Sequence, residues 1–262
     1  MAPNNASRQR YSLIVAAVVV IAVVVAVWLW VRADRPRAGS ATTPSNPAPA
    51  SSDSPPTTTT PPGFAYQPLW PFADTKAASA WEVAYGEGGL QPWHLDPGMT
   101  AQYFAQHYLG YAGIDKVVST SVRGDEAWIG VGFGQPGGAT VTAAVVHLVR
   151  FGPPPDAPWE VVGTQDSTLS VTAPAYGAAA SSPLTVGGRV TGVDENLRVQ
   201  VRSMGRQQQP VGEGPAIAGG GTDAQWSTTV PLGACSGTLT VAVAAGGHIA
   251  EVERFAMTGV HC

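Results

Sequence analysis

The residues that could carry out chemistry are few in this chain and lie far apart. The five histidines, at positions 94, 107, 147, 248 and 261, lack the spacing that is typical of a metal site. His94 and Asp96 lie close enough in sequence to act together as the acid–base pair of an envelope hydrolase. Asp96 is followed by Pro97, however, and this order is typical of a residue that caps a helix. We therefore predict no catalytic residue, no cofactor and no metal, and expect a protein that is not an enzyme.

A glycine motif also has a simpler interpretation than its spacing suggests. Gly132-Phe-Gly-Gln-Pro-Gly137 matches the spacing of a dinucleotide-binding loop. Such a loop binds a pyrophosphate only between a strand and the N-terminus of a helix. Pro136 and Gly138 are followed here by a β-branched stretch, so the segment predicts a hairpin loop.

Aromatic side chains are the better candidates for binding. One hypothesis is a ligand or partner rim at the Pro-rich segments 68–72 and 91–96, made of Trp70, Trp93 and His94. The alternative is that Trp93 and Leu95 hold the following helix against the core. A second hypothesis places a small ligand in the concavity of a sheet. The residues that would line that pocket are Tyr103, Tyr108, Trp128 and His147.

Residues 64–165 predict an α+β domain, with two helices on one face of an antiparallel sheet. Asp74 and Asp96 each precede a stretch with helical spacing of apolar residues, and Gly110 is placed to end the second helix. The predicted strands are 117–123, 127–133, 140–151 and 159–163.

Residues 166–262 predict an all-β sandwich. Leu197, Val199 and Val201 alternate with polar residues, as expected for a strand with one buried face. Short segments of this kind, separated by Gly-rich turns, are typical of an antiparallel sandwich. The predicted strands are 168–172, 184–192, 197–203, 211–217, 225–230, 238–244 and 252–260.

Three segments of this region, 171–174, 182–188 and 193–201, resemble the immunoglobulin-like domain of bacterial spore germination proteins. They correspond to a Pro-containing first strand, a Ser-Pro-Leu strand that ends in Gly, and an acidic residue before an alternating strand. The resemblance implies an extracytoplasmic β-sandwich without catalytic residues. The layout of the whole chain resembles membrane-anchored envelope proteins of actinobacteria.

The two cysteines lie on either side of the last predicted strands. Cys235 and Cys262 could form a disulfide if those strands end close together. Two free thiols, or a metal pair with His261, are the alternatives.

The N-terminal part predicts a membrane anchor. Residues 11–31 form an uncharged apolar segment of 21 residues, long enough to cross a bilayer as a helix. The alternative is a cleaved signal peptide, whose apolar region is shorter, about 7–15 residues. We predict that residues 1–10 are cytoplasmic and that the rest of the chain lies outside. Residues 32–63, rich in Pro, Ser and Thr, predict a disordered linker.

Charge argues against a nucleic-acid partner. Residues 64–262 contain 9 Lys and Arg and 16 Asp and Glu, a formal charge of 9 − 16 = −7, whereas phosphate binding needs a basic surface. We expect a single-pass protein of the bacterial cell envelope that binds or scaffolds an envelope protein or a cell-wall polymer; a role in germination or envelope maintenance is the hypothesis for its process. A small-ligand sensor or carrier and an envelope hydrolase are the alternatives.

Overall fold

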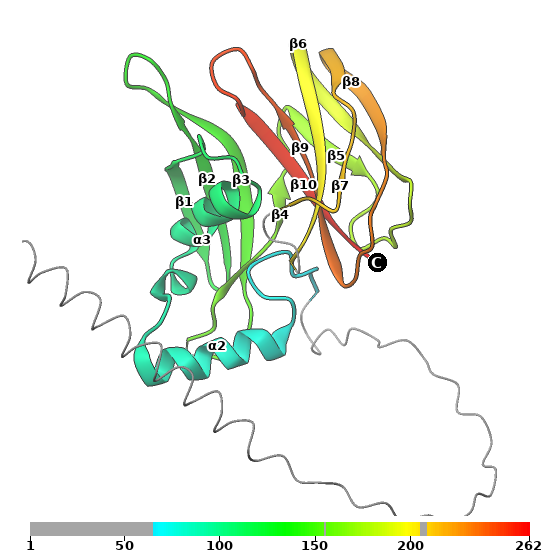
Figure 1. Cartoon of the computed structure of the whole chain (residues 1–262). Coiled ribbons are helices and arrows are strands. Elements are labelled where there is room, and N and C mark those ends of the chain that lie inside the picture. The colour runs from blue at the N-terminus through cyan, green and yellow to red at the C-terminus, as the bar shows by residue number, and fades with distance from the viewer. Residues whose placement is uncertain (1–64, 155, 205–208) are drawn as a thin grey trace, which may run out of the picture. The chain divides into compact units, whose positions relative to one another are not determined.

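The computed structural model describes residues 65–154, 156–204 and 209–262, which form most of one compact unit (Figure 1). The described part is mostly antiparallel β-sheet with two short α-helices. None of its helices has the length and apolar character needed to cross a membrane. The predicted cytoplasmic segment 1–10, anchor 11–31 and linker 32–63 lie outside the described residues.

Both predicted helix starts are confirmed. Helix α2 (Thr75–Gly88) begins after Asp74, whose Oδ1 accepts a hydrogen bond from the Ala77 amide at 2.8 Å. A 3-10 turn, η1 (Pro92–Leu95), leads to α3 (Pro97–Tyr103), which Asp96 caps by accepting from the Met99 amide at 2.9 Å. The second helix does not stay α-helical up to Gly110, because a π-helical turn, η2 (Phe104–Tyr108), follows α3.

The first sheet is a meander of β1 (Lys116–Arg123), β2 (Glu126–Gly134), β3 (Thr140–Arg150) and β4 (Trp159–Gln165). Helix α3 and η2 pack on the face that carries Ile129, Val131 and Val161. Helix α2 instead packs with Phe72 and Phe151 in a separate cluster, and Figure 1 shows it near one end of the strands. The expectation of two helices on one face therefore holds for α3 but not for α2.

The second sheet contains β5 (Leu169–Ala173), β6 (Leu184–Ser203), β7 (Gly212–Glu213), β8 (Ile217–Val230), β9 (Thr238–Ala245) and β10 (Arg254–His261). Its order is β10-β9-β6-β5, and β7 and β8 also pair with β6. The break predicted between the strands 184–192 and 197–203 is wrong, since β6 continues through Asp194-Glu195. Register shifts on either side of Gly192 are β-bulges, which let a strand bend without ending.

The bend in β6 closes the second sheet around a core. The first half of β6 pairs with β5 and β8, and its second half pairs with β9. Val186 and Val190 from the first half and Val199 and Val201 from the second half belong to the same buried cluster. The sheet therefore folds back on itself, with apolar side chains between its two halves.

The two sheets also share a hydrophobic core. Alternation along β9 buries Val241 and Val243 in the cluster inside the second sheet. The intervening Ala242 and Ala244, together with Phe255, belong to the cluster under α3 and the first sheet. The predicted boundary between residues 165 and 166 falls between β4 and β5, but apolar contacts join the regions on either side of it.

Candidate functional site

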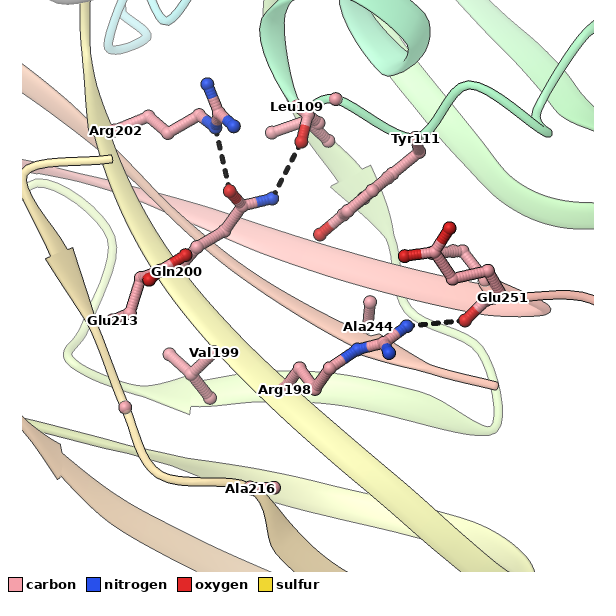
Figure 2. Close-up of a pocket in the computed structure, with 13 residues that line it drawn as sticks. Leu109, Tyr111, Arg198, Val199, Gln200, Arg202, Glu213, Ala216, Ala244 and Glu251 are labelled. Atoms are coloured by element: carbon pink, nitrogen blue, oxygen red, sulfur yellow. Dashed lines mark hydrogen bonds between the residues drawn. The ribbon is translucent and has the colours of Figure 1, made fainter. Parts of the chain in front are cut away.

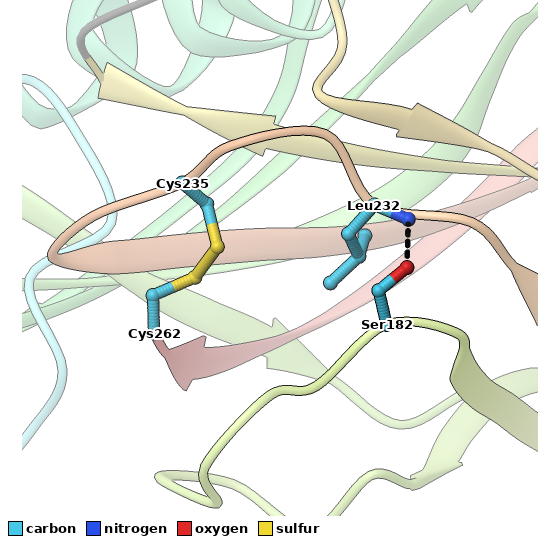
Figure 3. Close-up of a disulfide and its surroundings, with 4 residues drawn as sticks. All are labelled: Ser182, Leu232, Cys235 and Cys262. Carbon is cyan, nitrogen blue, oxygen red and sulfur yellow. Dashed lines mark hydrogen bonds between the residues drawn. A yellow bond between two sulfur atoms is a disulfide. The ribbon is translucent and has the colours of Figure 1, made fainter.

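The structure joins the two cysteines in a disulfide (Figure 3). Cys235 lies in the loop before β9 and Cys262 follows β10, with their Cα atoms 6.1 Å apart. The Cys262 amide donates to the Gly237 carbonyl at 3.0 Å, which fixes the end of β10 beside this loop. Among the described residues, no group of three or more His, Cys, Asp and Glu side chains could hold a metal ion.

Five of the seven residues predicted for the rim or the pocket lie in one aromatic cluster: Trp70, Trp93, His94, Tyr103 and Tyr108. Trp70 stacks on Trp93, with ring centroids 5.2 Å apart, and Trp70 and Tyr108 are both buried. Trp93 and Tyr103 are partly buried against the core of the first sheet. Of the two residues in the alternative interpretation, Trp93 packs against this core, whereas Leu95 packs against the separate cluster of Phe72 and Phe151.

His94 is a buried, neutral histidine of this cluster. It is 4% exposed, contacts Phe72, Trp81 and Trp93, and its Nδ1 has no hydrogen-bond partner among the described residues. Burial lowers the pKa of His94 to about 4. The exposed Asp96 carboxylate caps α3, so the site does not have the features of the acid–base pair that the hydrolase hypothesis requires.

The buried His94 predicts a loss of stability in acid. Its pKa is lower in the folded chain than the ordinary value of about 6.5 in the unfolded chain. The unfolded state therefore binds the proton first, and the contribution of His94 to the free energy of unfolding falls as pH drops from about 6.5 towards about 4, whereas buried Glu160, whose pKa is raised, contributes with the opposite sign. We expect His94→Gln to remove this contribution. The free energy of unfolding, measured in urea, should then fall less steeply from about pH 6.5 towards about pH 4 than in wild type. His107→Gln, at an exposed position, is the control, and equal slopes for wild type and His94→Gln would contradict the prediction.

The other two predicted residues lie elsewhere. Trp128 and His147 are paired across β2 and β3 and point away from the core, since Ala127 and Ile129 on either side of Trp128 point into it. Tyr108 lies on the core side, in contact with Trp70 and Phe104. The prediction that Tyr103, Tyr108, Trp128 and His147 line one pocket is therefore wrong, because the sheet separates them.

A cleft of about 460 Å³ lies where the second sheet meets the turn that follows η2 (Figure 2). Arg198, Gln200 and Arg202 line it from the outward-facing side of β6. The Gln200 amide donates to the Leu109 carbonyl at 3.0 Å, and Arg202 Nε donates to Gln200 Oε1 at 2.8 Å. Gln200 thus links the turn to β6 and positions the Arg202 guanidinium.

Charge in the cleft is mixed and partly buried. Arg202 is 7% exposed and Arg198 is exposed, while Glu213 and Glu251 lie at the edge. Burial lowers the pKa of Arg202, and the nearby Tyr108, Tyr111 and Glu213 oppose this shift.

The Tyr111 hydroxyl is a neutral donor that faces the cleft (Figure 2). Burial raises its pKa to about 12, partly offset by Gln200 and the two arginines. This oxygen is buried, and no group among the described residues meets hydrogen-bond geometry with it, although the Gln200 side chain lies close enough to lower the pKa of Tyr111. Since an unpaired buried polar group is costly, a ligand atom that accepts a hydrogen bond here would remove that cost.

Sequence reasoning missed this cleft and also Glu160. The outward row Arg198, Gln200 and Arg202 could be identified from the alternation of β6, but nothing in the sequence places the Leu109–Tyr111 turn over it.

Glu160 is fully buried in β4, where Oε2 accepts from the Phe72 amide at 3.1 Å, and burial raises its pKa well above the ordinary value.

Comparison with known proteins does not assign the chain to a family: no family model, no curated protein and no solved structure matches it.

Proposed function

We propose that this chain is a membrane-anchored binding protein of the bacterial cell envelope, with residues 64–262 outside the cytoplasm. The observation that carries the proposal is the cleft, which combines a buried guanidinium with an unpartnered buried hydroxyl. Pockets of this kind, with a few converging polar groups, are the usual ligand sites of proteins. The Cys235–Cys262 disulfide supports an oxidising compartment, and the apolar segment 11–31 supports an anchor in the lipid bilayer.

The second sheet supports the envelope assignment through its architecture. Six antiparallel strands that close around one core are consistent with the immunoglobulin-like sandwich expected from the resemblance to germination proteins. We assign it as a sandwich of that type. Such a module would present the cleft outside the membrane, at the end of the Pro-rich linker 32–63.

The ligand of the cleft carries a carboxylate. Arg198 and Arg202 supply positive charge beside Glu213 and Glu251, and a charge-assisted hydrogen bond from a guanidinium stabilises a carboxylate. Tyr111 adds a neutral donor. Carboxylates of this kind occur on an envelope protein or on the peptide parts of a cell-wall polymer, the two partner classes that the layout of the chain favours.

Topology can be tested with reporter fusions after Cys262. Alkaline phosphatase folds only where disulfides form, so we expect this fusion to be active and a green fluorescent protein fusion to be dark. The matched control deletes residues 11–31, which should abolish alkaline phosphatase activity. A fluorescent cytoplasmic fusion with inactive alkaline phosphatase would contradict the proposal.

The cleft can be tested with a small carboxylate probe. We expect N-acetylalanine to bind the full chain in detergent by ligand-observed NMR, and its neutral amide N-acetylalaninamide to bind at least tenfold more weakly. Arg202→Gln should weaken binding at least tenfold, because a charge-assisted hydrogen bond contributes about 1.5–3 kcal/mol.

Two further variants distinguish a loss of ligand binding from a loss of folding. Tyr111→Phe removes the hydroxyl without opening a cavity and should also weaken binding, whereas Arg189→Gln removes an exposed arginine that pairs with Asp223 and should not. Equal affinity of Tyr111→Phe and wild type would contradict a ligand site in the cleft.

A further inference from the structure

The outward face of the first sheet contains a second hollow. Ser119, Gly130, Val145 and Gln165 are paired in one row across all four strands. Gly130 has no side chain, and the Ser119 hydroxyl oxygen lies where a Cβ atom of residue 130 would be. A trough of about 490 Å³ on this face is lined by Ser119, Ser121, Arg123, Trp128, Val145 and Gln165.

The indole of Trp128 is held rigidly beside the trough. The His147 ring stacks on it, with centroids 4.9 Å apart and planes 5° apart. His147 Nε2 lies 3.0 Å from Glu126 Oε2, and the Tyr66 ring contacts His147 edge-on at 5.3 Å. Contacts on two sides of His147 thus fix the ring that orients Trp128.

The polar groups of the trough are available to a ligand. The side chains of Ser119, Ser121 and Gln165 make no hydrogen bond with any other residue in the described part of the chain. The Arg123 guanidinium lies 5.8 Å from the Trp128 ring centroid. Hydroxyl, amide and guanidinium groups therefore surround one fixed aromatic ring, and Val145 is the sole aliphatic residue of the lining.

We propose that this trough binds a sugar chain. A pyranose presents C–H groups on its flat face, which pack on an aromatic ring, and hydroxyls at its edge, which hydrogen-bond to groups such as Ser, Gln and Arg. A protein partner would need an apolar, desolvated centre, which this lining lacks. A nucleic acid would need a basic surface, and Arg123 is the one cation of the lining. This second site is separate from the cleft, whose lining residues it does not share.

The experiment titrates the full chain in detergent with oligosaccharides of glucose, of N-acetylglucosamine and of galacturonate, and follows tryptophan fluorescence and NMR shifts. We expect at least one of the three to bind, and Trp128→Ala to weaken that binding at least tenfold. The double variant Ser121→Ala/Gln165→Ala changes two exposed side chains and should weaken it even if Trp128→Ala fails to fold. Val122→Ala, at an exposed position outside the trough, is the matched control.

Two outcomes would overturn the sugar site: no binding of any of the three sugars at millimolar concentration, or wild-type affinity in the Ser121→Ala/Gln165→Ala variant. Arg202→Gln should bind the sugar normally, which separates this test from that of the cleft.

Discussion

Loss of the Cys235–Cys262 disulfide should lower the free energy of unfolding by about 3.5 kcal/mol. The bridge closes a sequence separation of 27 residues, and the chain-entropy model gives this magnitude for such a loop. The loop contains β9 and β10, which contribute to both hydrophobic clusters. Without the bridge, the unfolded chain gains conformational freedom that the folded chain does not.

Urea unfolding of the full chain in detergent measures this effect. Cys235→Ser, Cys262→Ser and the double variant should be equally destabilised, because each removes the same covalent link. Wild type under reducing conditions should behave like the variants. The prediction is wrong if oxidised wild type and the double variant unfold at the same urea concentration.

Gly132→Ala should destabilise the chain by about 3 kcal/mol, the upper part of the range for overpacking a close-packed site. A Cβ atom at Gly132 would lie 1.7 Å from the Val141 carbonyl oxygen and 3.1 Å from the Thr142 Cα. Both atoms belong to the backbone of β3, so no side-chain rotation can relieve the overlap. The position coincides with a register shift between Val131 and Gly132, where the two strands come close.

Gly134→Ala is the matched control for this prediction. It lies two residues away on the same strand, and a Cβ atom there would have no other atom within 4 Å. Thermal and urea unfolding of the two variants should therefore differ clearly. Equal stability of Gly132→Ala and Gly134→Ala would show that β3 can move away from β2 at low cost.

Local signals in the sequence are sufficient for most of the secondary structure. Asp74 and Asp96 cap their helices because a carboxylate at that position needs only the next few amides. The alternation of Leu197, Val199 and Val201 predicts a buried face, and all three side chains are buried. Both features depend on residues that are neighbours in the chain.

Features that depend on tertiary structure could not be predicted in the same way. Asp194-Glu195 has the composition of a turn, yet pairing with β8 keeps the strand continuous there. The candidate sites are of this kind too. Trp128 and His147 become neighbours only through the register of β2 and β3, and Tyr111 meets Arg202 only because the two sheets share a core.

That shared core has a consequence for biosynthesis. Ala242 and Phe255 complete the cluster under the first sheet, although they lie 242 − 165 = 77 and 255 − 165 = 90 residues after Gln165, the end of its last strand. The first sheet is therefore translated long before β9 and β10, which cover its apolar face together with α3 and η2. Until β9 and β10 are translated, a nascent chain would have only α3 and η2 to cover this face, and proteases and chaperones would encounter its uncovered part during that interval.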